Sequence, residues 1–423
     1  MNVLIEPGPL CGKIAAIPSK SHLHRLLICW ALGSAEVFVP CRTVSEDIEA
    51  TARCLNALGA NIGRSPEGFH ILPSAFRSPE RAALDCGESG STYRFLVPLV
   101  CALGLRARFA LAGRLSERPL EELRSALRMH GAVFEGAGTR SPAVSGPVTG
   151  GIYEIPGGVS SQYISGLLIA LPLLGQSSEI VIVGEAQSKG YIRMTLDVLE
   201  SFKVKVIPVP GGYAIPGGQS YAAPEMLLPE GDWSNASFWL CAAAAGAGEI
   251  TVTGLDTRTN QGDSRICDVL ARFGAGVEVS NGAVTVRPGE LRGIAVDAGD
   301  IPDLVPAIAV AAAAARGETV ITNAGRLRHK ESDRISAVCA VLRSLGGEAS
   351  EGADNIIIRG RGALAGGTAD SCGDHRIAMM AAVASVICKG SVKITNAGAV
   401  NKSYPGFFED LASLGGQFTK EDY

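Results

Sequence analysis

Five cations lie where the sequence predicts that helices begin, namely Lys20, Arg118, Lys330, Arg376 and Lys402. A positive charge at the amino end of a helix is unfavourable by a few tenths of a kcal/mol to about 1 kcal/mol, because the helix dipole is positive there. Five such charges in equivalent positions indicate that negatively charged groups normally bind at these helix starts. The free backbone N–H groups of each helix start would add to the anion site.

Two carboxylates, Asp303 and Glu331, are interspersed with these cations, and Arg25 and Arg334 add further positive charge. A carboxylate in such a basic site stays ionised and can act as a base. Serine, aspartate and asparagine at the same helix starts are explained by ordinary capping. The charged residues therefore predict two polyanionic substrates and a step of proton transfer.

An internal repeat of about 72 residues must position these side chains. Its anchors are six leucines, Leu55, Leu127, Leu199, Leu270, Leu342 and Leu411. Five of the six copies have glycine four residues later, and the third copy has Lys203 there. Because glycine directly after an apolar helical stripe favours a left-handed helix stop, the repeat predicts six equivalent helix ends.

Each repeat also carries a short β-rich segment that reads as a strand. These segments are residues 36–39, 107–111, 179–183, 249–253, 318–322 and 391–395. An apolar helix is expected before each strand, the leucine-bearing helix after it, and then a hairpin. The hairpin is clearest at 277–279 and 284–286, where the intervening Asn281 and Gly282 favour a type I′ turn. The predicted unit is βαβαββ.

The ends of the repeats predict how the chain divides. The sixth unit stops at 417–419 with one hairpin strand, and residues 2–5 form a spare strand, so we expect the N-terminus to complete the last unit. A Pro/Gly-rich stretch at 215–224 separates units three and four. We therefore predict one lobe of residues 1–14 with 228–423 and another of 15–227, three units in each, with the active site in the cleft between them.

Composition predicts a compact cytoplasmic protein. Hydrophobic residues make up 47% and charged residues 19%, which suits two cores. No apolar run reaches the ~20 residues that span a bilayer, and no signal peptide is recognisable. The eleven cysteines are scattered without metal-ligand spacing, so we expect reduced thiols and no metal. A net charge of −4 without a basic run argues against a nucleic-acid surface.

Several motifs resemble those of the 5-enolpyruvylshikimate-3-phosphate (EPSP) synthase family. Residues 18–25 (PSKSHLHR) resemble the family signature PGSKSxxNR, and residues 87–94 (GESGSTYR) are similar to its glycine-rich loop. Further motifs match in order at 116–119, 160–162, 188–191, 301–303, 330–334, 374–376 and 402–405. The resemblance implies an α/β fold of two inside-out α/β barrels. It also implies transfer of the enolpyruvyl group of phosphoenolpyruvate to the 5-hydroxyl of shikimate 3-phosphate, through a tetrahedral intermediate that expels phosphate.

The resemblance also implies roles for single residues in this step of aromatic amino acid biosynthesis. The residues implied to hold shikimate 3-phosphate are Lys20, Ser21, Arg25, Ser160, Ser161, Gln162, Ser188, Asp303, Arg326 and Lys330. Those implied to hold phosphoenolpyruvate are Lys20, Gly90, Arg118, Gln162, Arg334, Arg376 and Lys402. Asp303 would accept the proton of the 5-hydroxyl, and either Glu331 or Lys20 would act at the enol carbon. A monomer without cofactor is implied.

The sequence departs from the family pattern in places, and other functions must be weighed. Arg326 stands where asparagine often contacts the shikimate phosphate, so it either keeps that contact or turns away. The related enolpyruvyl transferase that acts on UDP-N-acetylglucosamine carries a cysteine in the loop before its Arg-Pro pair, which residues 111–119 lack. A serine hydrolase is disfavoured because residues 87–91 end in serine where G-x-S-x-G needs glycine. A non-catalytic repeat scaffold would not need five cations at helix starts.

Overall fold

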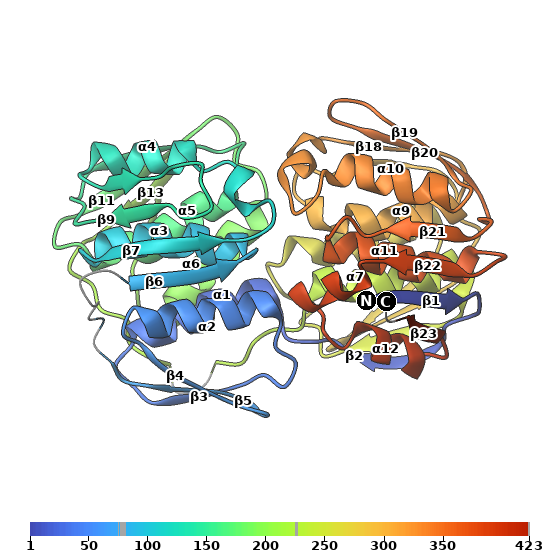
Figure 1. The fold of residues 1–423 in the computed structure, drawn as a ribbon, viewed down its shortest axis with the longest axis horizontal. Helices are drawn as coiled ribbons and strands as arrows, with labels where there is room; N and C mark the ends of the chain where they lie inside the picture. Colours follow the sequence, from blue (N-terminus) through green and yellow to red (C-terminus); the bar gives the residue numbers. More distant parts are fainter. Residues whose placement is uncertain (75, 77–81, 225–226, 422–423) are drawn as a thin grey trace. The chain divides into compact units, whose positions relative to one another are not determined.

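The computed structural model describes residues 1–74, 76, 82–224 and 227–421 (Figure 1). The chain divides into two compact units. Unit 1 contains Met1–Ser19 and Glu230–Tyr423, and unit 2 contains Lys20–Pro229. No described helix is both long enough and apolar enough to cross a membrane.

Unit 2 contains repeats one to three. Its strands are β3 (Val37–Pro40), β4 (Asn61–Ser65), β5 (Gly68–Leu72), β6 (Ala82–Gly87), β7 (Arg106–Leu111), β8 (Val133–Glu135), β9 (Ala143–Ser145), β10 (Ile152–Pro156), β11 (Ser178–Val183), β12 (Ile207–Val209) and β13 (Gly212–Ile215). Its helices are α1 (Lys20–Leu32), α2 (Glu46–Ala57), α3 (Gly90–Ala102), α4 (Glu121–Met129), α5 (Ser161–Ala170) and α6 (Lys189–Ser201), with 3-10 turns η1 (Leu115–Glu117) and η2 (Leu171–Leu173). The described strands form sheets in the orders β3-β5-β4, β6-β7-β9-β8 and β10-β11-β13-β12.

Unit 1 contains repeats four to six. Its strands are β1 (Asn2–Glu6), β2 (Gly12–Ala15), β14 (Ile250–Thr253), β15 (Gly276–Ser280), β16 (Ala283–Arg287), β17 (Ala295–Asp297), β18 (Arg316–Thr322), β19 (Glu348–Glu351), β20 (Ile356–Arg361), β21 (Gly367–Asp370), β22 (Val392–Thr395) and β23 (Gln417–Glu421). Its helices are α7 (Trp233–Ala242), α8 (Ile266–Phe273), α9 (Val305–Ala314), α10 (Arg334–Ser344), α11 (His375–Ala384) and α12 (Phe407–Ser413). Short helical turns are η3 (Ala243–Ala247), η4 (Gly262–Arg265), η5 (Pro302–Leu304), η6 (Gly325–His329), η7 (Ser385–Ile387) and η8 (Ala397–Lys402). The sheet orders are β15-β16-β14-β2, β17-β18-β20-β19 and β21-β22-β1-β23.

The first helix of each repeat lies at the centre of its unit. Nearly every residue of α7, α9 and α11 is buried, and the three helices pack against one another. In unit 2, α3 and α5 pack together in the same way. Strands such as β6 and β10 alternate between buried and exposed residues, so each sheet turns one face to these helices and the other to solvent. Helices inside and sheets outside are the arrangement that the family resemblance implied.

The repeat period has a direct structural cause. All six repeat leucines are fully buried, with 0% of their surface exposed. Each is followed four residues later by a residue with positive φ, from +86° at Gly346 to +108° at Gly131 for the glycines. Lys203 takes the same left-handed position in the third copy, with φ +61°. The predicted helix ends are therefore confirmed, and Lys203 occupies a conformation that costs a non-glycine residue about 1–2 kcal/mol.

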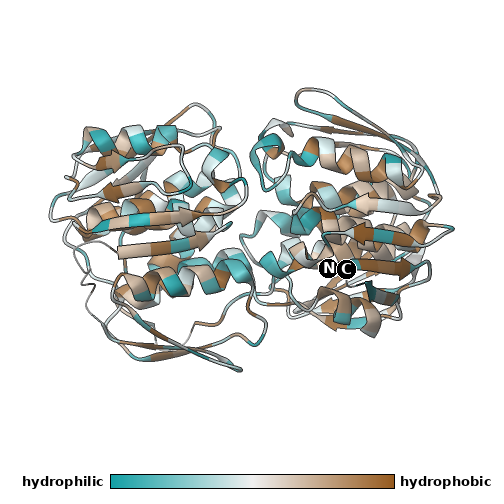
Figure 2. Cartoon of the chain, in the orientation of Figure 1, coloured by the Kyte–Doolittle hydropathy of each residue, from teal (hydrophilic) through white to brown (hydrophobic). Residues whose placement is uncertain are grey.

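The N-terminus completes the last repeat, as predicted. Strand β1 pairs antiparallel with both β22 and β23, and Figure 2 shows its hydrophobic colouring. Strand β2 continues into the same unit, where it pairs in parallel with β14 and supplies the first strand of repeat four. The sequence assigned residues 1–14 to this unit and indicated no first strand for repeat one. In unit 2, the segment beside the second strand position of repeat one comes from the end of the unit, where Tyr221 forms a parallel bridge with Gly33.

The hairpin between β15 and β16 is confirmed, but its turn type is not. Ser280 pairs with Ala283, so the turn has two residues, Asn281 and Gly282. Gly282 has φ +76°, whereas Asn281 is not among the described non-glycine residues with positive φ. A type I′ turn requires positive φ at both central residues, so this prediction was wrong.

Replacement of Lys203 by glycine should stabilise the protein. The left-handed backbone at Lys203 is strained for a residue with a Cβ and is free of that strain for glycine. Glycine gains entropy in the unfolded chain, which offsets part of this stabilisation. We therefore expect a net increase of about 1 kcal/mol in the free energy of unfolding of Lys203→Gly, measured by urea denaturation. Lys205→Gly is the control, because Lys205 has no positive φ, and it should not be more stable than the parent. Equal loss of stability in both variants would contradict this account.

Candidate active site

Several of the sequence-predicted site residues lie in two clusters, one in each unit. We name them by their central residues. The Arg334 cluster of unit 1 comprises Asp303, Lys330, Glu331, Arg334, Asp374 and Arg376. The Gly90 cluster of unit 2 comprises Gly90, Ser91, Arg94, Arg118 and Gln162.

Helix starts position the Arg334 cluster. Asp303 lies on η5, directly before α9, and Arg334 is the first residue of α10. Asp374 caps α11 by accepting the backbone N–H of Arg376 at 2.9 Å. Because α9, α10 and α11 pack against one another, their amino ends bring these side chains together.

The guanidinium of Arg334 bonds to three carboxylates at once. Its Nη1 donates to Asp303 at 2.7 Å and its Nη2 to Glu331 at 2.6 Å. Its Nε donates to Asp374 at 2.8 Å. The side chain is 1% exposed, and the surrounding carboxylates keep it charged despite its burial. Arg334 therefore fixes the positions of both candidate proton-transfer carboxylates, Asp303 and Glu331.

Asp303 is surrounded by cations. In addition to Arg334, Lys330 Nζ lies 3.4 Å and Arg376 Nε 3.5 Å from Asp303 Oδ1. Burial alone would raise the pKa of Asp303, but the charges of Arg376, Lys330 and Arg334 outweigh it and hold the pKa well below its ordinary value. Asp303 is therefore an ionised carboxylate, as the sequence predicted.

Lys402 and Arg326 bond to backbone carbonyls next to this cluster. Lys402 Nζ donates to the carbonyl of Gly373, one residue before the cap of α11, at 2.6 Å. The guanidinium of Arg326 donates to the carbonyl of Gly299, in the loop that follows β17, at 2.6 Å. The sequence left two positions open for Arg326, and the structure shows its side chain held against this loop.

The helix starts that carry the five cations, in both units, differ in detail from those expected from the sequence. Lys20 and Arg376 lie in the first turns of α1 and α11. Arg118, Lys330 and Lys402 instead lie at the ends of 3-10 turns that precede the second helices. A 3-10 turn is too short to show a periodic pattern, so the sequence predicts one continuous helix where the structure has a turn followed by a helix.

In unit 2, Gly90 begins α3 against two arginines. A Cβ on Gly90 would lie 2.8 Å from a guanidinium nitrogen of Arg118 and 2.8 Å from one of Arg94. Glycine therefore lets both guanidinium groups approach the amino end of α3, and backbone N–H groups at a helix start can add to an anion site there.

Gln162 links Arg94 to the glycine-rich loop. Its carbonyl oxygen accepts from Arg94 at 3.0 Å, and its amide nitrogen donates to Ser91 Oγ at 2.9 Å. A second donor of Arg94 bonds to the carbonyl of Pro119 at 3.0 Å. Arg94 ends the motif at 87–94 and had no role assigned from the sequence, although a charged residue at the end of a matched motif was a usable signal.

Serines and a lysine occupy the other helix starts of unit 2. Ser160 caps α5 by accepting the N–H of Gln162 at 3.3 Å, and Ser161 is the first residue of that helix. Ser188 precedes α6 in a left-handed conformation with φ +54°. Lys20 Nζ contacts Asp47 at 2.7 Å, an ion pair that the sequence did not indicate.

Arg25 is buried among neutral groups. Its nitrogens donate to Thr195, Ser165 and the carbonyl of Tyr191 at 2.7–3.2 Å, and it also donates to the carbonyl of Ser21. Burial lowers the pKa of Arg25 to about 10, so it remains charged at neutral pH. Most of its donors are thus engaged in holding α1, α5 and α6 together.

The histidines of the first motif do not form a metal site among the described residues. His24 is fully buried, and its Nδ1 lies 2.7 Å from Thr51 Oγ1. Burial, with Lys20 and Arg25 adding to it, lowers the pKa of His24 well below its ordinary value. No group of three metal-ligating side chains is found in the part of the chain that the structure describes.

Comparison with known proteins gives a consistent result. The family model of EPSP synthase (3-phosphoshikimate 1-carboxyvinyltransferase) matches residues 5–411. The 3-phosphoshikimate 1-carboxyvinyltransferase of Clostridium kluyveri is 40% identical over 420 residues, which cover 98% of this chain and 97% of that protein. That of Methanocorpusculum labreanum is 37% identical and covers 100% of both chains. An EPSP synthase structure from Acinetobacter baumannii has a TM-score of 0.81 at 26% identity and covers 99% of this chain and 100% of that chain. The predicted fold class is confirmed by this likeness.

Asp263 gives the stability of unit 1 a dependence on pH. It is buried beside Asp303 and accepts a hydrogen bond from Ser234. Burial, with Asp303 adding to it, raises the pKa of Asp263 to about 6, from about 4 in an unfolded chain. A carboxyl whose pKa is raised on folding stabilises the protein fully below the unfolded value, and this contribution is lost as the pH rises through the folded value.

We therefore expect Asp263→Asn to become more stable relative to the parent between pH 4 and pH 7, by about 1–3 kcal/mol in the free energy of unfolding. Urea denaturation at the two pH values measures this difference. Asp268→Asn, on the exposed side of α8, is the control and should show no such change. A difference between parent and Asp263→Asn that does not vary with pH would contradict the assignment.

Proposed function

Because the chain belongs to the EPSP synthase family, we propose that it transfers the carboxyvinyl group of phosphoenolpyruvate to the 5-hydroxyl of shikimate 3-phosphate and releases phosphate. The observation that carries the proposal is the ionised Asp303 among three cations. Both substrates are polyanions, and the reaction needs a base for a hydroxyl proton.

Asp303 is the proposed base for the 5-hydroxyl. In the absence of substrate its pKa is held low by Arg376, Lys330 and Arg334. When the anionic groups of the substrates bind these cations, less positive charge is left to stabilise the carboxylate. The pKa of Asp303 would then rise towards that of a useful base, so substrate binding itself would activate the group.

Glu331 and Lys20 are the proposed acid–base groups at the enol carbon. Glu331 is 13% exposed and bonds to Arg334 at 2.6 Å, and Lys20 is paired with Asp47. Each has an ionic partner that could take up the change of charge when a proton moves. We propose that one of the two protonates the methylene carbon, and that residues from both units serve this one reaction.

The remaining cations would bind phosphoenolpyruvate. We assign Arg334, Arg376 and Lys402 of unit 1 to it, with Arg118, Gln162 and the amino end of α3 at Gly90 in unit 2. Preoriented guanidinium groups and N–H donors also stabilise the charge that develops on a departing phosphate, and such electrostatic effects are commonly the largest in catalysis. The reaction proposed here uses only acid–base and electrostatic groups of the chain, so we propose that it needs no cofactor.

Shikimate 3-phosphate would be held by its phosphate and its ring. Ser160, Ser161, Ser188 and Lys330 are assigned to the phosphate, and Ser21, Arg25 and Gln162 to the ring. Arg326 lies four residues before Lys330 and would reach the phosphate with the part of its guanidinium that does not bond to Gly299. We further propose that the protein acts as a monomer in the cytoplasm.

The acceptor specificity can be measured directly. We expect phosphate release from phosphoenolpyruvate in the presence of shikimate 3-phosphate and none with UDP-N-acetylglucosamine, because residues 111–119 contain no cysteine. The assay follows inorganic phosphate, with each acceptor omitted in turn as the control. Turnover with the sugar nucleotide alone would overturn the proposal.

Replacement of Lys20 by methionine should abolish most activity while leaving the fold intact. Loss of one prepositioned charge at a reacting centre lowers the rate by roughly 100-fold or more, so we expect at least this decrease in kcat/KM for Lys20→Met. Lys13→Met, an exposed lysine on β2, is the matched control and should keep its activity. Circular dichroism and the thermal midpoint verify folding of both variants. Near-normal turnover of a folded Lys20→Met would remove Lys20 from the site.

A further inference from the structure

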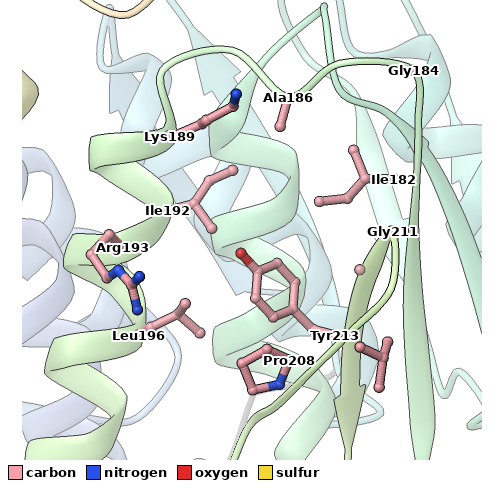
Figure 3. Close-up of a pocket in the computed structure, with 12 residues that line it drawn as sticks. Ile182, Gly184, Ala186, Lys189, Ile192, Arg193, Leu196, Pro208, Gly211 and Tyr213 are labelled. Atoms are coloured by element: carbon pink, nitrogen blue, oxygen red, sulfur yellow. The ribbon is translucent and has the colours of Figure 1, made fainter.

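A cavity of about 430 Å³ lies in unit 2 between α6 and the sheet β10-β11-β13-β12 (Figure 3). None of its lining residues belongs to the Arg334 or the Gly90 cluster, and none is assigned to either substrate above. Its volume falls within the range of about 300–1,000 Å³ that small-molecule sites occupy.

The sequence explains why this space is not filled by side chains. Gly211 and Gly212 form the turn and the start of β13, and Gly184 follows β11 with φ +77°. A Cβ on Gly212 would lie 1.8 Å from the carbonyl oxygen of Ile180, so a larger residue cannot stand there without a shift of the backbone. The sheet therefore faces α6 across a region lined partly by glycine.

The lining of the cavity is apolar at its base and cationic on one side. Ile182 of β11 and Ile192 and Leu196 of α6 supply aliphatic surface, and the ring of Tyr213 lies between Pro208 and the helix (Figure 3). Arg193 extends from α6 on the side to which the Tyr213 hydroxyl points. Burial raises the pKa of Tyr213, and the charge of Arg193 opposes this.

The lining also includes Lys189, whose Nζ donates to Glu185 at 3.2 Å. The other two polar groups, the Arg193 guanidinium and the Tyr213 hydroxyl, are not engaged by another described residue. Arg193 forms no ion pair or hydrogen bond within the described part of the chain, and the Tyr213 hydroxyl has no hydrogen-bond partner there. By contrast, the exposed Arg53 of the same unit is paired with Asp85 at 3.2 Å. A guanidinium and a hydroxyl beside an apolar surface match a ligand with one planar anionic group and an apolar body, because arginine binds a carboxylate with two parallel hydrogen bonds.

We propose that this cavity binds a small amphipathic monocarboxylate. Its ring or short aliphatic body would lie on Ile182, Ile192 and Leu196, and its carboxylate would accept hydrogen bonds from Arg193 and Tyr213. The loop from Gly184 to Ser188 borders the same cavity through Gly184 and Ala186. The proposal does not depend on the reaction proposed above, since the two share no residue.

The test compares a carboxylate with its neutral amide on the intact chain. We expect 3-phenylpropanoate to bind, as measured by isothermal titration calorimetry, and 3-phenylpropanamide to bind about tenfold more weakly, because a charge-assisted hydrogen bond contributes more than a neutral one. Arg193→Gln should weaken binding of the carboxylate about tenfold and Tyr213→Phe about fivefold. Arg53→Gln is the matched control and should bind like the parent.

Two further arms locate the bound probe. Saturating shikimate 3-phosphate should leave the affinity for 3-phenylpropanoate unchanged. Leu196→Trp, whose larger side chain fills the cavity, should abolish binding of 3-phenylpropanoate. The thermal midpoint of this variant verifies that it is folded. The proposal is overturned by a lack of binding at concentrations on the order of 10 mM, at the weak limit of small-ligand affinities. Equal affinity in Arg193→Gln and the parent, or displacement by shikimate 3-phosphate, would overturn it as well. Because these readouts do not involve turnover, they separate this proposal from that of the enzymatic reaction.

Discussion

The buried guanidinium of Arg334 is the interaction on which the candidate site depends. A charge that is 1% exposed must be compensated inside the protein, and Asp303, Glu331 and Asp374 compensate it. The dependence is mutual, because three carboxylates could not approach one another without this cation. Since Asp303 lies on η5, Glu331 before α10 and Asp374 at the cap of α11, one side chain ties three separate segments of the chain to a common point.

This network changes the electrostatic picture that the sequence suggests. Cations counted along the chain imply strong mutual repulsion, which substrate anions would relieve. In the structure, carboxylates already neutralise much of this charge, with Asp303 shared among Lys330, Arg334 and Arg376. Substrate anions would therefore compete with Asp303 for its cations rather than fill an uncompensated site. This competition couples binding to the basicity of Asp303, a relation that depends on distances and that residue types alone do not contain.

Features that depend on local sequence were predicted well. Buried leucines such as Leu270 and left-handed glycines such as Gly274 repeat because each helix end meets the same local requirement. The repeated string ITNAG has a similar cause, since Asn323 and Asn396 are both left-handed residues directly after a strand. Features that depend on tertiary contacts were missed. The Lys20–Asp47 pair and the cavity beside Tyr213 join residues whose sequence spacing carries no periodic signal.

The path of the chain has a consequence for how the candidate site forms. Unit 2 is one continuous segment, Lys20–Pro229, whereas unit 1 needs both ends of the chain. Strand β1 pairs with β22 and β23, about 390 to 420 residues away in sequence. Pairings between such distant residues are expected to form late, because the intervening chain must first lose entropy. Unit 2 has no such requirement and can form its cluster from local repeats. The Arg334 cluster lies in the unit that needs both ends of the chain, so we expect it to form later in folding than the Gly90 cluster.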